Sequence, residues 1–200
     1  MTYNNHFTTK CLGAEDIPAF LALHEAVPPE KKGFLKPRTP EDLQAHIDSG
    51  MPMMGVYDGN KLVAGALLTF SGRGPVKFLE GYTSLETAAV VQSVAAIQKG
   101  AMGTLMGFAK EQAHEAGYHF LMAKVNSENK CGVGAFSKHQ FDIVETKPDP
   151  LGGNYTAHFM RAVVASPVPA VATEPQHGQG LPGCQFLTEA LLGECQPAHT

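Results

Sequence analysis

An apolar segment, a glycine-containing turn and an amphipathic helix follow one another in the middle of the chain, and this succession constrains the fold most. Residues 88–97 are apolar except for Gln92 and Ser93, which is typical of a central strand covered on both faces. Residues 104–116 have helical periodicity, with Gly117 at the expected helix end. Their apolar side contains Leu105, Met106, Ala109, Ala113 and Ala116. We therefore expect a strand and a helix joined by residues 98–103, QKGAMG.

The remaining pattern predicts an α/β (α+β type) domain with a mixed, mostly antiparallel central sheet of about seven strands flanked by helices. A helix should begin near Glu15, and a second one at Pro40 with Thr39 as its N-cap. A third, short helix is expected at 129–139. Alternation and turn residues predict strands at 7–12, 53–57, 61–70, 76–82, 120–125, 141–145 and 155–163.

The end of the chain differs in composition from the rest. Residues 1–164 are predicted to form the domain, and residues 165–200 a Pro/Gly/Ala-rich linker and tail. Residues 184–192 have helical spacing, and a short docking helix and a frayed terminus both fit them.

Composition argues against several classes of function. The 15 basic and 19 acidic residues give a net charge of −4, without the basic stripe that nucleic-acid binding needs. The N-terminal residues lack the apolar core of a signal peptide and no stretch is long and apolar enough to cross a bilayer, so we expect neither a signal peptide nor a membrane span. The four cysteines lack metal-ligand spacing, so we expect reduced thiols, no metal and a cytoplasmic location.

The QKGAMG loop is suited to bind a phosphate. Backbone N–H groups at a helix N-terminus lack partners within the helix, and Gly100 and Gly103 let a phosphate approach them. The loop is not a Walker motif, because no Gly-Lys-Ser/Thr follows, and its spacing differs from the Rossmann fingerprint. A strand-to-helix turn that binds nothing fits the same residues.

Residues 94–141 resemble the GCN5-related N-acetyltransferase (GNAT) family. That family has a Gln/Arg-x-x-Gly-x-Gly/Ala loop, in which Gln98 and Gly103 match and Ala101 replaces the first glycine. An Asn-x-x-Asn type helix start follows at Asn126 and Asn129. An aromatic residue five positions before a Phe then corresponds to residues 136 and 141, and the element order over 5–164 also fits.

The resemblance implies acetyl-CoA, or another acyl-CoA, as acyl donor and ligand. Its pyrophosphate would bind the backbone of Gln98, Lys99, Gly100, Ala101, Met102, Gly103 and Thr104. Its pantetheine would lie between the diverging strands 88–97 and 120–125, paired with backbone groups of Ser93, Val94 and Ala95. Asn126 and Asn129 would hydrogen-bond the ligand near the thioester, with helix capping as the other interpretation of both.

The implied reaction is direct transfer of the acyl group to a primary amine. The N–H of Val94 would polarise the thioester carbonyl, and Glu80 or Glu86 would accept the amine proton. Glu80 and Glu86 are also compatible with a solvated loop. Phe136 stands where family members often have a Tyr that protonates the leaving thiol, so Ser137 and His139 are the alternative proton donors.

Two departures leave the phosphate-binding register open by one residue: Gly100 comes one position early, and Ala95 and Ala96 stand where a Pro is usual. Three hypotheses follow. The first is an N-acyltransferase acting on a small-molecule or protein amine, with a homodimer compatible with the fold. The second is a catalytically silent GNAT-fold binding or regulatory module. The third, a hydrolase using Cys131 and His139, has little support, because these residues are eight positions apart on one short helix.

Overall fold

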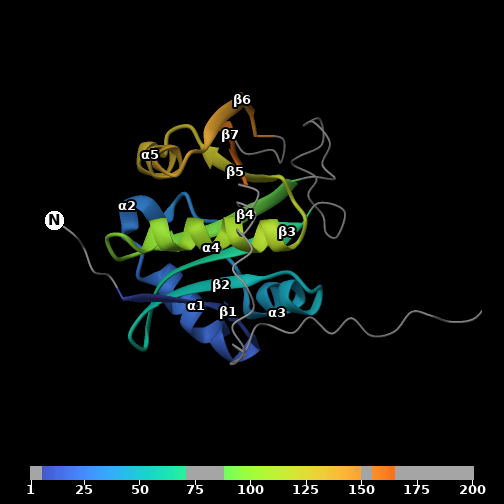
Figure 1. Cartoon of the computed structure of the whole chain (residues 1–200). Coiled ribbons are helices and arrows are strands. Elements are labelled where there is room, and N and C mark those ends of the chain that lie inside the picture. The colour runs from blue at the N-terminus through green and yellow to red at the C-terminus, as the bar shows by residue number, and fades with distance from the viewer. Residues whose placement is uncertain (1–5, 71–87, 150–154, 165–200) are drawn as a thin grey trace, which may run out of the picture. The chain divides into compact units, whose positions relative to one another are not determined.

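The computed structural model of the 200-residue chain describes residues 6–70, 88–149 and 155–164. These residues form a seven-stranded sheet in the order β1-β2-β3-β4-β5-β7-β6 (Figure 1). Only β4 and β5 pair in parallel, and all other neighbours are antiparallel. The strands are β1 (Phe7–Leu12), β2 (Met53–Asp58), β3 (Lys61–Phe70), β4 (Ala88–Ala96), β5 (Phe120–Asn126), β6 (Asp142–Pro148) and β7 (Thr156–Val163).

Helices cover both faces of the sheet. The 3-10 turn η1 (Ala14–Asp16) leads into α1 (Ile17–Glu25), and α2 (Pro29–Lys32) and α3 (Pro40–Asp48) follow before the first hairpin. Helix α4 (Ala101–Glu115) connects β4 to β5, and α5 (Lys130–Lys138) connects β5 to β6. Figure 1 shows α4 lying across the sheet, with α1 and α3 beside β1 and β2.

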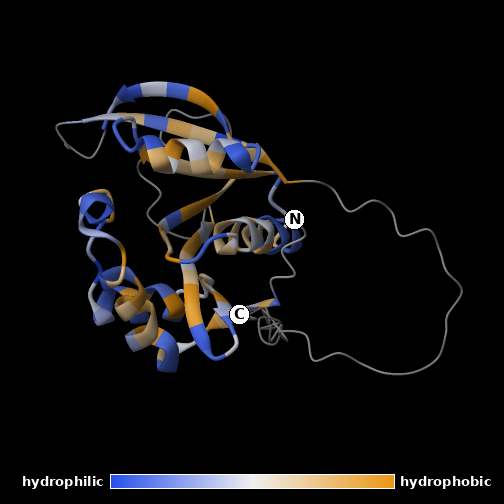
Figure 2. Ribbon diagram, turned by 90° about the vertical axis from the view of Figure 1, so that its left-hand side faces the viewer, coloured by the Kyte–Doolittle hydropathy of each residue, from blue (hydrophilic) through white to orange (hydrophobic). Residues whose placement is uncertain are grey.

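Apolar clusters on both faces of the sheet hold these layers together. Leu105, Met106 and Ala109 of α4 are buried against one face, among residues of β2 to β5. On the other face, Phe20 of α1 and Leu43 of α3 are both 0% exposed and pack with residues of β2 and β3. Long apolar stretches along the strands and mixed polar and apolar helices are visible in Figure 2.

The predicted fold class is confirmed, and the predicted helices and strands that lie within the described residues occur in the expected order. Thr39 caps α3, because its side chain accepts a hydrogen bond from the Asp42 N–H and Asp42 returns one to the Thr39 N–H. The parallel β4–α4–β5 unit makes the sheet mixed, as expected. The predicted strand 76–82, the linker and the tail lie outside the described residues.

Two expectations need correction. Helix α4 begins at Ala101 instead of Thr104, because Gly100 takes the left-handed conformation (φ 92°) and ends the loop three residues earlier. The segment between the first two predicted helices also contains α2, a single turn that begins at Pro29, a favoured first helical residue.

Candidate functional site

The parallel strands β4 and β5 separate along their length. They pair only from Ala88 to Val90 on β4 and from Phe120 to Met122 on β5. Strand β4 continues to Ala96 and β5 to Asn126, so the backbone edges beyond Val90 face each other without pairing. Because backbone N–H and C=O groups require hydrogen-bond partners, this divergence provides a place where a ligand's amides can bind.

A β-bulge in β4 lies at the point of divergence. Opposite it on β3, Gly65 pairs with Ala95 and Leu67 with Gln92, so Ser93 and Val94 both stand opposite one residue. Ser93 has φ 49°, a left-handed conformation that is uncommon for a residue with a side chain. Such bulges redirect backbone groups next to functional sites.

Side chains from α1 and from the segment before α3 support the bulge. The carbonyl oxygen of Ser93 accepts a hydrogen bond from His24 Nε2 at 3.1 Å, and its hydroxyl accepts one from Arg38 Nε at 2.9 Å. Burial lowers the pKa of His24, so the imidazole is neutral at pH 7 and donates to this carbonyl. Arg38 Nη2 also donates to Gln92 Oε1 at 3.2 Å, and Gln92 donates to Thr69.

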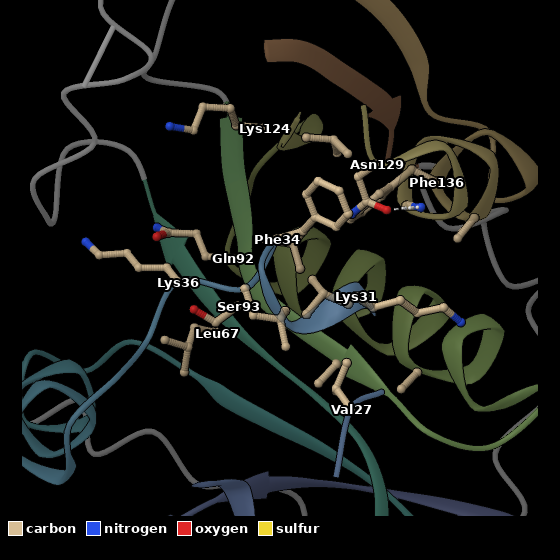
Figure 3. Close-up of a pocket in the computed structure, with 18 of the residues that line it drawn as sticks. Val27, Lys31, Phe34, Lys36, Leu67, Gln92, Ser93, Lys124, Asn129 and Phe136 are labelled. Carbon is tan, nitrogen blue, oxygen red and sulfur yellow. Dashed lines mark hydrogen bonds between the residues drawn. The ribbon is translucent and has the colours of Figure 1, made fainter. Parts of the chain in front are cut away.

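A groove of about 1550 Å³ follows the divergence of the strands. Figure 3 shows Gln92 and Ser93 of β4 on one side and Asn129 and Phe136 on the other. The groove extends from the α2 region and the bulge to Gly100 and Met102 at the start of α4. Its volume exceeds the range of roughly 300–1,000 Å³ usual for small-ligand pockets, so a long ligand and a second one can both enter it.

The first turn of α4 forms the far end of this groove. Gly100 in the left-handed conformation followed by helical Ala101 is the arrangement that directs consecutive N–H groups toward an anion. Ala101 and Gly103 donate to Gln98 and Gly100, whereas the N–H groups of Gly100 and Met102 have no backbone acceptor in the described segments. The loop therefore presents fewer unpaired backbone N–H groups than expected, because residues 98–104 were all predicted to bind the pyrophosphate.

Gln98 and Lys99 differ in their surroundings. Gln98 Nε2 donates to Asp58 Oδ2 at 2.7 Å, so this side chain joins the loop to the β2–β3 turn. Lys99 lines the groove, as does Lys138 of α5. Two ammonium groups near a helix N-terminus make this end of the groove electropositive and suited to phosphates.

Asn129 has the helix-capping role that was the alternative interpretation, whereas Asn126 stabilises the turn before the helix. Asn129 Oδ1 accepts from the Gly132 N–H at 2.8 Å, the bond drawn in Figure 3, and Asn126 Oδ1 accepts from the Glu128 N–H at 2.8 Å. A side chain at position 132 would collide with Asn129, since a Cβ there would lie 2.6 Å from Nδ2. Both residues also line the groove, where their amide N–H₂ groups can donate to a ligand.

Phe136 and the residues near it point to different hollows. Phe136 is 7% exposed and packs edge-to-face on Phe141 with ring centroids 5.0 Å apart, while also lining the groove. His139 and Cys131 line a second hollow of about 520 Å³ beside the first turn of α4. Burial, and then the charges of Lys110 and Lys138, lower the pKa of His139.

A buried ion pair at the other end of the groove was not predicted. Lys124 Nζ lies 2.7 Å from Asp149 Oδ1, with side-chain exposures of 16% and 5%. Tyr155 hydrogen-bonds Asp149, and burial, this bond and the carboxylate charge raise the pKa of Tyr155 to about 12. The signal available in the sequence was a lysine inside the apolar strand FLMAKVN.

The structure brings most of the predicted site residues together. Glu80 and Glu86, the predicted bases, lie outside the described residues and stay predictions. Ser93, Val94, Ala95, Gln98, Lys99, Gly100, Met102, Asn126 and Asn129 line the groove. Ala101 is buried beneath the loop at 0% exposure, and Gly103 faces the second hollow.

Comparison with solved structures identifies the fold. The chain resembles the GNAT-family acetyltransferase from Streptococcus pneumoniae (TM-score 0.60, 15% identity, 80% of this chain and 100% of that one). It also resembles a protein from Salmonella typhimurium assigned as an acetyltransferase and solved with its cofactor acetyl-CoA (0.61, 15%, 84% and 100%). A third similar structure is the ribosomal-protein-S18-alanine N-acetyltransferase of Escherichia coli (0.59, 13%, 84% and 99%). The architecture is therefore the GNAT fold.

Sequence comparison adds no closer relative. No protein-family model matches the chain, and no curated protein sequence matches it.

None of the described helices combines the length and apolar character that a membrane-spanning helix requires. Within residues 6–70, 88–149 and 155–164, no three His, Cys, Asp or Glu side chains form a group that could hold a metal ion.

Proposed function

We propose that this protein is an N-acyltransferase that moves an acetyl group from acetyl-CoA to a primary amine. The observation that carries the proposal is the divergence of β4 from β5, with a bulge at one end and the glycine start of α4 at the other. An elongated acyl-CoA matches this groove, because its phosphates need N–H donors and cations and its pantetheine needs unpaired strand edges.

Each end of the groove supplies a different part of the chemistry. Open N–H groups at Gly100 and Met102, with Lys99 and Lys138, would hold the phosphates. The Val94 N–H at the bulge would donate to the thioester oxygen as it gains negative charge. The amine then bonds to the acyl carbon while the carbon–sulfur bond breaks, so the protein must accept a proton from the amine and let a thiolate leave.

Phe136 favours the silent binding module as a second candidate. A buried phenyl ring cannot protonate a thiolate, so acetyl-CoA would bind without turnover if nothing else supplied that proton. A thiolate is a good leaving group, and the cation Arg38 lines the groove next to the bulge. We therefore favour the enzyme and expect acetylated product from at least one amine.

Calorimetric titration with acetyl-CoA tests the proposed binding site. Gly103→Glu should weaken binding at least about 100-fold, because a carboxylate in the first turn repels phosphate. Gly107→Glu is the charge control, because it adds the same charge to the same helix. A Cβ at 107 meets nothing within 4 Å, whereas a Cβ at 103 lies 3.2 Å from His139 Cε1, so the thermal stability of both variants is measured beside binding. The Gly107 variant should bind normally.

Two results would count against this function. Absence of both heat and a thermal shift above about 1 mM acetyl-CoA would mean that the loop is only a turn. Equal binding by the Gly103 and Gly107 variants would place the phosphates elsewhere. The homodimer stays a prediction, and sedimentation at working concentration measures it.

A further inference from the structure

Within the described part of the chain, two cations on the bulge side of the groove form no ion pair with a carboxylate. Arg38 and Lys36 both belong to the segment between α2 and α3, and both line the groove. None of the ion pairs within the described segments includes either residue. Figure 3 shows Lys36 on the side of Gln92 and Ser93, with its ammonium group pointing away from α5.

Arg38 is held in a fixed orientation by neutral acceptors. Its Nε and Nη2 donate to Ser93 Oγ and Gln92 Oε1, at 2.9 and 3.2 Å. A guanidinium carries five N–H donors, so three remain after these two bonds. The planar fork that they form matches a carboxylate, which neither Ser93 nor Gln92 supplies.

The acidic side chains on this wall are already engaged. Asp149 is paired with Lys124 at 2.7 Å and also holds Tyr155. The carboxylate of Asp42 accepts the Thr39 N–H at 3.2 Å as part of the α3 cap, although its charge still attracts Arg38. Lys124 and Asp149 offset each other, and Asp42 keeps its negative charge. Among the described residues, Lys36 and Arg38 therefore leave this end of the groove with an excess of positive charge toward a second ligand.

The location of Arg38 fixes where a bound carboxylate would lie relative to the reaction. Arg38 bonds to Ser93, the bulge residue directly before Val94, whose N–H is the proposed donor to the thioester. In an α-amino acid one carbon carries both the carboxylate and the amine. A carboxylate on Arg38 therefore brings that amine next to the bulge, and the nearby cations lower the amine pKa toward the neutral, nucleophilic form.

We propose that the acyl acceptor is an α-amino acid or a small analogue with a carboxylate beside its amine, held by Arg38 with Lys36 as a second cation. This inference rests on the proposed acyltransferase function. It specifies the group that is recognised, the carboxylate, and the residue that binds it, Arg38. Neutral amines and polyamines lack this element and should be poor acceptors.

Matched pairs of acceptors test the proposal. The full chain is supplied with acetyl-CoA and each standard L-amino acid or its carboxamide, and N-acetylated product is measured by mass spectrometry. This readout avoids thiol reagents, which would also label the exposed Cys131. The amide has the less basic amine, so chemistry alone favours it and the comparison is biased against the proposal. For at least one pair, we expect kcat/KM at least about tenfold higher for the acid, as a charge-assisted bidentate contact gives.

Three variants separate recognition from structure. Arg38→Gln should raise KM for the acid at least about tenfold, and should lower kcat/KM for the acid at least about tenfold more than for the amide, because the lost support of the Ser93 bulge affects both substrates alike. Lys36→Gln should have the same selectivity with a smaller effect. Lys32→Gln removes one charge from the adjacent turn, where Lys32 pairs with Glu25 away from the groove, and should change neither substrate's kinetics.

Several outcomes would overturn the inference. Equal or faster acetylation of the amides, or of a polyamine such as spermidine, would remove the carboxylate requirement. If Arg38→Gln lowers kcat/KM equally for the acid and the amide, Arg38 supports the bulge or the thioester and does not bind the acceptor's carboxylate. Binding of acetyl-CoA with no turnover of any acid would also overturn the inference. Absence of acetyl-CoA binding would instead contradict the proposed acyltransferase function.

Discussion

The α4 end and the bulge end of the groove differ in what they offer a ligand. At α4 the open donors are main-chain N–H groups of Gly100 and Met102, supported by a helix N-terminus. At the bulge the donors are side chains that converge from separate segments, such as Arg38 before α3 and Lys124 on β5. The first end depends on backbone conformation, and the second depends on charges held by tertiary packing.

This difference predicts how each end tolerates substitution. A backbone site survives most side-chain changes but fails when bulk or negative charge enters the turn. A site made from charges fails when one member of a pair is lost, because the remaining charge is then buried alone. Changes at the bulge end should therefore affect folding and acceptor use, while acetyl-CoA binding at α4 persists.

The largest stability effect should come from Asp149→Asn. The substitution keeps the shape but removes the carboxylate that forms the ion pair with Lys124, whose side chain is 16% exposed. Loss of one partner of such a pair should lower the free energy of unfolding by about 3 kcal/mol. Urea denaturation measures this loss, and the acetyl-CoA dissociation constant of the folded variant should be unchanged.

Glu145→Gln is the matched control for that experiment. Glu145 pairs with Lys147 at 3.4 Å, and their side chains are 40% and 29% exposed, so the loss should stay below about 1 kcal/mol. Equal losses in the two variants would mean that burial does not set the value of the Lys124–Asp149 pair. A large fall in acetyl-CoA affinity in Asp149→Asn would show that the two ends are coupled.

The same contrast explains how much could be predicted from the sequence. Strand–loop–helix periodicity and the glycines identified the α4 end, because backbone sites leave a local signal. The helix start was still wrong by three residues, since a glycine pattern alone does not show which glycine takes the positive φ. The Lys124–Asp149 pair and the contacts of Arg38 join residues 25 and 55 positions apart, and no local pattern encodes such contacts.

Acid should destabilise the protein mainly through the bulge end. Burial lowers the pKa of His24 and of His46, so each takes up a proton more readily when unfolded. Their contribution is complete above the unfolded pKa of about 6.5 and is lost as pH falls toward the lower folded pKa, at up to about 1.4 kcal/mol per pH unit for each proton. Urea denaturation between pH 7 and 5 should show stability falling with pH.

Two histidine variants test which end of the groove causes that pH dependence. His24→Gln should make the slope shallower, while also costing stability at pH 7 because the bond to Ser93 changes. His139→Gln should change the slope less, because His139 lies in a more open hollow at the α4 end and solvent screens its charge. If the slope of stability against pH changes more in the His139 variant than in the His24 variant, the α4 end causes the pH dependence.

The smallest effect expected, that of Thr39→Ala, is also the most selective. The change removes the hydroxyl that caps α3 and should cost about 1 kcal/mol. Thr39 directly follows Arg38, so fraying of this cap should loosen the Arg38 anchor and raise KM for a carboxylate acceptor several-fold, with acetyl-CoA affinity constant. Gln44→Ala, on the same helix, removes only an exposed bond to Asp48, lies outside the groove lining and should alter neither constant. The opposite outcome is a Thr39 variant that loses stability but keeps its KM for the acceptor. It would show that the hydrogen bonds to Ser93 and Gln92 hold Arg38 in place, and that the α3 cap does not contribute.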